Sequence, residues 1–96
     1  MQYGGSVYIL TNQINTVLYI GVTSDLYARI CEHKEKKYPE SFTAKYNCNK
    51  LLYYEFHSRI EEAIAREQQM KKWKREWKER LIGSLNPNWT DLFYKL

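Results

Sequence analysis

The sequence predicts a mixed α/β (α+β) fold, in which a small, three-stranded, mainly antiparallel sheet is flanked by helices. Two short β-prone runs near the N-terminus lie on either side of a largely polar stretch, and a third lies mid-chain. Two further segments carry apolar residues at helical spacing. The expected order is therefore β-β-α-β-α-α. With 96 residues, 44% of them hydrophobic, the chain is expected to form one domain, residues 1–96, with a real core.

The first two strands are expected to form a hairpin. Residues 7–10 and 17–22 are β-prone runs with period-2 alternation, joined by residues 11–16. A four-residue loop at 12–15 would place Tyr8 opposite Tyr19, with the two side chains about 5 Å apart on one face. A register shifted by one residue would separate the two tyrosines.

The first helix is expected to follow this hairpin directly. Thr23 or Ser24 can cap it, with Asp25 in the first turn, and it should run to about residue 34 or 37. Residues 38–49 predict a loop or a short helix, and residues 50–56 predict the third strand.

A long helical segment follows the third strand. Ser58 and Glu61 fit a capping box at its start, and Gly83 fits the position just beyond a helix that ends at Ile82. The apolar phase changes around Trp73, which indicates a bend or two consecutive helices. Residues 86–89 then predict a turn, and residues 92–93 a short amphipathic tail.

Ionisable residues interrupt the apolar faces of both predicted helices. The two faces, at i, i+3, i+4 and i+7 spacing, are Leu26, Arg29, Ile30 and His33 on the first helix, and Ile60, Ala63, Ile64 and Glu67 on the second. Charged side chains are rarely buried unless they are paired, bind a ligand or face a cleft. A carboxylate and a guanidinium that both point inward predict a site for a metal ion and a phosphate.

The net charge of +4 is concentrated in one stretch. Residues 71–80 contain six basic and two acidic residues, and the rest of the chain is balanced. Trp73 and Trp77 lie in the same stretch, and basic residues interleaved with aromatic ones suit a nucleic acid. A solvated helix whose tryptophans pack inward explains the pattern equally well. The candidate nucleic-acid-binding residues are Lys45, Lys71, Lys74 and Lys78.

Other features bound the class of protein. No stretch approaches the ~18 consecutive apolar residues of a membrane span, and residues 1–6 do not resemble a secretory signal. Cys31 and Cys48 are expected to be free thiols, which favours a cytoplasmic location. A zinc site built from these cysteines with His33 and His57 is not expected, because the usual close cysteine spacing is missing.

Taken in order, these residues resemble the GIY-YIG nuclease superfamily. The motifs that carry the resemblance are Tyr8, Tyr19-Ile20-Gly21, Thr23, Arg29-x-x-x-His33 and Ala63-Ile64-Ala65-Arg66-Glu67. The similarity covers most of the chain, and residues 45–55 and 86–89 resemble the small stand-alone branch of the superfamily. The first motif departs from the family pattern, because Ser6-Val7-Tyr8 retains only its tyrosine.

The resemblance implies a metal-dependent phosphodiesterase that hydrolyses DNA. Glu67 would be the sole protein ligand of Mg²⁺ (or Mn²⁺), a cation that needs few carboxylates because it keeps several waters. Arg29 would bind the phosphate oxygens, and His33 would assist Arg29 or a proton relay. Tyr8 would be the general base or a relay to it, which requires a nearby cation because tyrosine titrates near ~10. Tyr19 would orient the attacking water.

Each of these residues also has a purely structural explanation. Tyr8 and Tyr19 can be a cross-strand aromatic pair, and Gly21 can serve close backbone approach. Arg29 can pair with Glu32 or Asp25, and Glu67 with Lys71. His33, near a helix C-terminus, can interact with the helix dipole.

The sequence leaves the target of the activity open. The chain lacks room for a separate specificity domain, so it would select DNA by structure, cut with little preference, or take specificity from a protein partner. RNA is not excluded as a substrate. Two alternatives are a nucleic-acid-binding module that has lost turnover, and a protein-interaction domain that uses Trp73 and Trp77.

Overall fold

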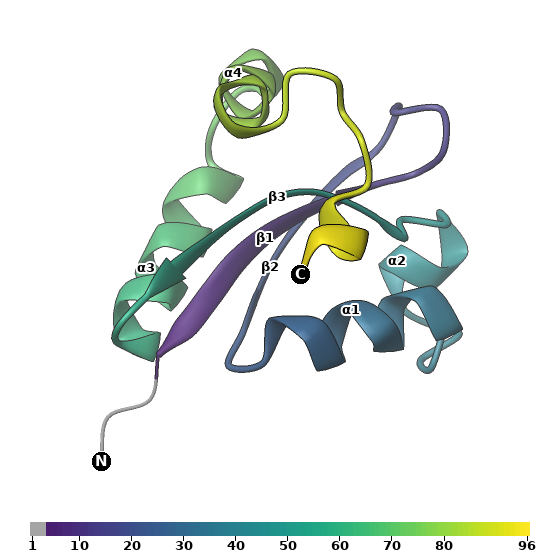
Figure 1. Ribbon diagram of the computed structural model, residues 1–96, viewed down its shortest axis with the longest axis horizontal. Coiled ribbons are helices and arrows are strands. Elements are labelled where there is room, and N and C mark those ends of the chain that lie inside the picture. The colour runs from purple at the N-terminus through teal and green to yellow at the C-terminus, as the bar shows by residue number, and fades with distance from the viewer. Residues whose placement is uncertain (1–3) are drawn as a thin grey trace.

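The computed structural model describes residues 4–96, so residues 1–3, part of the stretch searched for a secretory signal, lie outside it. It confirms the predicted fold class: a three-stranded antiparallel sheet between two layers of helices (Figure 1). The strands are β1 (Gly5–Thr11), β2 (Leu18–Thr23) and β3 (Lys50–His57). The helices are α1 (Leu26–Glu35), α2 (Phe42–Lys45), α3 (Ile60–Lys71) and α4 (Arg75–Leu85), followed by the 3-10 helix η1 (Leu92–Lys95).

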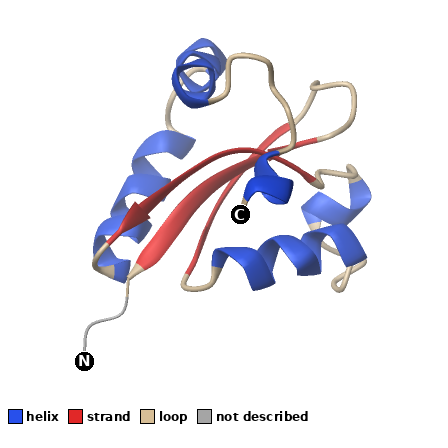
Figure 2. Ribbon diagram, in the orientation of Figure 1, coloured by secondary structure: helices blue, strands red, loops and turns tan. Residues whose placement is uncertain are grey.

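β1 is the central strand of the sheet, whose order is β2-β1-β3. Helices α3 and α4 cover one face, while α1, α2 and η1 lie on the other (Figure 2). Every residue of β1 is buried, because both sides of the strand face a core. Its apolar run therefore belongs to a strand covered on both faces, where alternate side chains enter different cores.

The predicted hairpin forms, but its register is two residues away from the prediction. Tyr8 lies opposite Gly21, and Tyr19 lies opposite Leu10. The side chain of Asn12 explains the longer loop, since its Oδ1 accepts hydrogen bonds from the backbone amides of Thr16 (2.9 Å) and Val17 (3.1 Å). A shift of two residues preserves the faces of the strand, so the two tyrosines remain diagonal neighbours.

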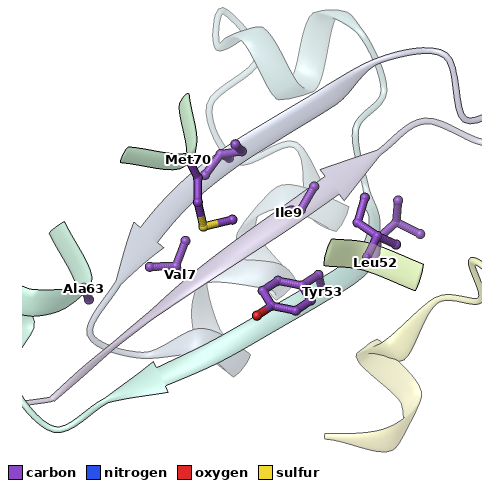
Figure 3. Packing of buried hydrophobic residues seen from close by; sticks show 8 residues of the cluster. Val7, Ile9, Leu52, Tyr53, Ala63 and Met70 are labelled. Atoms are coloured by element: carbon purple, nitrogen blue, oxygen red, sulfur yellow. The ribbon is translucent and has the colours of Figure 1, made fainter. Parts of the chain in front are cut away.

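Tyr53 is the one aromatic residue among the buried side chains of the core under α3 and α4 that the structure describes, and Trp73 and Trp89 pack against its edge. Val7 and Ile9 of β1 pack against Ala63 and Met70 of α3, as Figure 3 shows. A β-bulge opposite Ile9 and Leu10 adds Leu52 to the strand, and both Leu52 and Tyr53 contribute to this core.

The opposite core joins α1 to the C-terminal segment. Ile30 of α1 is fully buried against Tyr8 and Leu10, together with Leu92 of η1. Lys34 on α1 forms an ion pair of 2.6 Å with Asp91, whose other carboxylate oxygen accepts from the Leu51 amide of β3. These contacts hold α1 in a fixed position over the sheet.

Three predicted helix ends were wrong. Asp25, rather than Thr23 or Ser24, caps α1, because its Oδ1 accepts from the amide of Ala28 at 3.2 Å. The capping box at Ser58 and Glu61 does not form: α3 begins after Arg59, and the Glu61 carboxylate lies 3.7 Å from Arg59 instead.

At the other end, α4 runs through Gly83 to Leu85, so Gly83 is not the residue that ends it. The buried side chain of Asn86 ends the helix instead, since its Nδ2 donates to the carbonyls of Leu52 and Thr90. Residues 86–89 form the expected turn, with a hydrogen bond from the Trp89 amide to the Asn86 carbonyl.

The predicted change of direction near Trp73 is confirmed, because α3 and α4 are separate helices. Ile64 was expected on the buried face of α3 but is 41% exposed, whereas Ala63 and Met70 are fully buried. No helix within residues 4–96 combines the length and the apolar character that crossing a bilayer requires.

Candidate active site

The hydroxyl of Tyr8 marks the centre of the candidate site. Tyr8 projects from the central strand, and its ring lies across Gly21 of the neighbouring strand β2. A Cβ at position 21 would collide with the ring and hydroxyl of Tyr8, so a larger residue there would displace them. Gly21 thus permits a close approach, but to a tyrosine side chain rather than to a backbone.

His33 connects Tyr8 to α2 through a buried chain of hydrogen bonds. The Tyr8 Oη lies 2.9 Å from the Nε2 of His33, and the Nδ1 of His33 lies 2.9 Å from the Oγ1 of Thr43. All three residues are buried. The helix dipole therefore does not account for the placement of His33, which is fixed by partners on both of its ring nitrogens.

Arg29 lies one turn before His33 on the same helix. Its Nη1 donates to the Oε1 of Glu32 at 3.0 Å, and its Cζ lies 5.7 Å from the centre of the Tyr38 ring. The pairing with Glu32 is the structural alternative that the sequence offered. Two-thirds of the Arg29 side chain is covered, and the accessible remainder lines a small pocket.

Burial and charge act in opposite directions on the hydroxyl of Tyr8. Burial raises the pKa of Tyr8 to about 12, although the neighbouring Arg29 lowers it. The same kind of effect lowers the pKa of His33 to about 4, because burial and then the charge of Arg29 disfavour the imidazolium form. The cation expected beside Tyr8 is present, but burial outweighs its effect, and both residues are neutral at pH 7.

Tyr19 lies on β2 next to this pair. Its ring centre is 6.4 Å from that of Tyr8 and 5.9 Å from that of His33. Together with Arg29 and His33 it lines a small pocket of about 70 Å³, which Phe42 borders on the α2 side. The pocket reaches His33 and Thr43, two members of the buried chain of hydrogen bonds.

Glu67 approaches the site from α3, which packs on the other face of β1 and β2. Its side chain is only 14% exposed, and its Oε2 lies 3.4 Å from the Nζ of Lys71, whose side chain is half exposed. The carboxylate is close enough to Tyr8 for its charge to raise the pKa of that hydroxyl. All five predicted site residues, Tyr8, Tyr19, Arg29, His33 and Glu67, therefore lie around the β1–β2 side of the sheet.

The donor set fits one kind of cation. No three His, Cys, Asp or Glu side chains within residues 4–96 cluster as a metal site, so a cation held by protein ligands alone does not fit. Mg²⁺ does fit, because it takes one or two carboxylates and completes its shell with waters and substrate phosphate oxygens. Glu67, with one exposed lysine as its partner, is a carboxylate of this kind.

The predicted basic residues do not form one continuous helical face, because the chain leaves the helical path between α3 and α4. Lys71 and Lys78 line an open hollow of about 370 Å³ with Tyr19 and Phe42. Lys74 is the exposed N-cap residue of α4. Lys45 lies on α2, with its Nζ 3.6 Å from Glu40.

Thr43, the second partner of His33, is a site residue that was not predicted from the sequence. Thr43 lies in the segment for which a loop or a short helix was expected, and no periodic pattern marks it. The one local signal is Ser41, whose Oγ accepts from the amide of Ala44 and caps α2. That cap indicates the helix, but the contact between Thr43 and His33 depends on how α2 packs.

Comparison with known families agrees with this geometry. The family model described as the GIY-YIG catalytic domain matches residues 4–80. The chain therefore belongs to the GIY-YIG family, whose domains are typically nucleases and generally depend on divalent metal ions. Comparison with the curated proteins and with solved structures found no match.

Proposed function

We propose that this protein is a divalent-metal-dependent endonuclease that hydrolyses phosphodiester bonds of DNA in the cytoplasm. The observation that carries the proposal is the buried contact between Tyr8 and His33, which lies beside Arg29 and within range of the charge of Glu67. A cross-strand aromatic pair would need neither the buried histidine nor the guanidinium. The set would instead supply a proton acceptor, a phosphate ligand and a metal ligand, as phosphodiester hydrolysis requires.

The proton of the attacking water would pass through Tyr8 to His33. With the His33 proton on Nδ1, donated to Thr43, the free Nε2 accepts the proton of the Tyr8 hydroxyl. The Tyr8 oxygen can then take a proton from water as it gives up its own, so it never carries a full negative charge. The raised pKa of Tyr8 favours this relay over a tyrosine that is ionised beforehand.

Arg29 would hold the non-bridging oxygens of the phosphate. Its guanidinium already makes one contact with Glu32, which fixes its plane, and its remaining donors can form a bidentate contact. Tyr19, beside Tyr8 and His33, would position the water for attack.

Glu67 would hold the metal ion, Mg²⁺ or Mn²⁺. When bound, the cation would polarise the phosphate and stabilise the leaving oxygen. The low exposure of Glu67 keeps its carboxylate in place, while Lys71 partly offsets its charge until a cation binds. Specificity would come from DNA structure or from a protein partner.

One assay tests this function directly. Purified protein is incubated with duplex, single-stranded, flapped and branched DNA of one sequence, with Mg²⁺, with Mn²⁺ or with a chelator. We expect cleavage of at least one DNA with metal and none with chelator. Metal-independent binding without cleavage of any DNA would instead indicate a binding module that has lost turnover. RNA of the same sequence, assayed in parallel, tests whether the protein prefers DNA to RNA.

A further inference from the structure

We propose that Tyr19, Phe42 and Tyr46 form a stacking platform that binds an unpaired DNA base beside the phosphate to be cut. This inference rests on the proposed function and adds the class of substrate. Phe42 stacks on Tyr19 with ring centres 6.0 Å apart and an interplanar angle of 25°. Tyr46 continues the row, with its ring centre 4.6 Å from that of Phe42.

The platform is too exposed to serve only as an anchor for α2. Phe42 is 47% exposed and Tyr46 is 53% exposed, whereas the residues that α2 buries are Thr43 and Ala44. Aromatic rings that stay about half exposed and lie together at the surface are typical of an interaction site.

The position of Phe42 connects the platform to the candidate site. Phe42 borders both the small pocket that contains Arg29 and the open hollow that contains Lys71 and Lys78. A DNA strand with its phosphate at Arg29 would therefore have a neighbouring nucleotide next to Phe42. The hollow, at about 370 Å³, lies in the size range of ligand sites, roughly 300–1,000 Å³.

The charge around the platform favours nucleic acid over a protein partner. Lys71 and Lys78 border it on the α3–α4 side, and Lys45, the last residue of α2, directly precedes Tyr46. Lys78 forms no ion pair in the part of the chain that the structure describes, while Glu67 and Glu40 pair with Lys71 and Lys45. Cations next to stacked aromatic rings are the usual means of binding single strands.

The geometry also selects an unpaired base. In a duplex both faces of each base are covered by its neighbours, so an aromatic ring at the surface cannot stack on them. An unpaired nucleotide exposes its π face, and such stacking is largely independent of sequence. The substrate class is therefore DNA with at least one unpaired nucleotide next to the scissile phosphate, as in a single strand, a flap or a gap.

Metal-free binding separates this inference from the catalytic proposal. Anisotropy of labelled single-stranded and duplex oligonucleotides in chelator gives the affinities of the wild type, Phe42→Leu, Tyr46→Leu and the double variant. Phe56→Leu is the matched control, because Phe56 is a 71% exposed phenylalanine on β3, the strand at the other edge of the sheet. Thermal unfolding shows whether each variant is folded. If Phe42→Leu does not fold, Tyr46→Leu alone tests the platform.

We expect the double variant to lose roughly 5- to 150-fold in affinity for the single strand for each base that stacks, and less than about threefold for the duplex. A 2-aminopurine base in the single strand should be quenched by the wild type and by Phe56→Leu but not by the double variant. An equal loss on both DNA forms, or unchanged affinity and quenching, would overturn the platform. Binding and quenching by the wild type, without cleavage in the presence of Mg²⁺ or Mn²⁺, would support the platform while refuting the proposed nuclease activity.

Discussion

At Tyr8, the tertiary structure reverses what the residue type and its charged neighbour would suggest. A guanidinium close to a phenol favours ionisation, yet burial raises the pKa of Tyr8 to about 12. Its hydrogen-bonding partner His33 is also neutral, because burial has the opposite effect on a base and lowers the pKa of His33. The pair is therefore suited to transferring a proton during a reaction rather than to storing a charge.

Tyr8→Phe removes the hydroxyl that would relay the proton. We expect the single-turnover cleavage rate to fall by roughly 10²- to 10⁴-fold, the usual contribution of a general base. Because the hydroxyl is buried against His33, the variant should also lose about 1–3 kcal/mol of stability, measured by urea unfolding. Tyr53→Phe is the control, since it removes another tyrosine hydroxyl of the sheet, one that donates a hydrogen bond to Glu55. Equal rates for both variants would leave Tyr8 a packing role only.

Glu67→Gln keeps the size of the side chain but removes the charge that would hold a hard cation. We expect cleavage in Mg²⁺ to be lost, while stability changes by about 0.5 kcal/mol or less, because the i,i+4 partner Lys71 is half exposed and the amide can still form hydrogen bonds. Glu62→Gln is the control, because Glu62 is an exposed carboxylate earlier on α3, and this variant should cut at the wild-type rate. Cleavage by Glu67→Gln at that rate would exclude Glu67 from the reaction, and loss of folding would indicate a structural ion pair.

At the level of elements, the break between α3 and α4 decides what the basic stretch can do. A continuous helix would carry its lysines away from Glu67 along one axis, about 1.5 Å per residue. The two separate helices instead bring Lys71 and Lys78 to the same hollow as Tyr19. The break separates the two tryptophans in burial. Trp73 packs against the core, while Trp77 contacts the Trp73 ring and is half exposed.

Alanine at Lys71, Lys74 and Lys78 tests whether these residues contact DNA. Each phosphate contact adds roughly 0.9 to the slope of log affinity against log salt on duplex DNA. We therefore expect the triple variant to bind more weakly and to have a salt slope flatter by up to about 2–3, with nearly unchanged turnover at saturation. Lys95→Ala, on η1, is the control. Identical slopes for the wild type and the triple variant would mean that the lysines are merely solvated.

At the level of the whole molecule, burial of His33 couples the candidate site to folding. The pKa of His33 is about 4 in the folded protein and near its ordinary 6.5 in the unfolded chain. Between these values the unfolded state binds more protons, so stability rises with pH across this window and is fully present above it. The polar chain that prepares the site thus limits the stability of the fold in acid.

Urea unfolding at pH 7.5 and pH 5.0 measures this coupling. We expect the free energy of unfolding to be lower by about 2 kcal/mol at pH 5.0 because of His33 alone. The difference between the wild type and His33→Gln isolates that contribution from other groups, such as Glu32, whose pKa is lowered by Arg29 and Lys37. Equal pH dependence of the two proteins would show that His33 does not titrate in this window.

Local patterns in the sequence determined the elements and the set of candidate residues. Apolar spacing placed Ile30 and His33 on one buried face and located the break near Trp73, because helix periodicity is a property of a few consecutive residues. The capping residues were less predictable. Ser58, Asp25 and Gly83 each fit several positions within a turn, and packing selects among them.

The tertiary structure alone decided how the candidate residues meet. The hydrogen bonds that the Oδ1 of Asn12 accepts from the hairpin loop set the register, which puts Gly21 rather than Tyr19 opposite Tyr8. The position of α2 supplies Thr43 to His33, and the depth of the pair sets the pKa of Tyr8. Register, partners and desolvation all depend on atoms far apart in the chain, so no local pattern in this sequence encodes them.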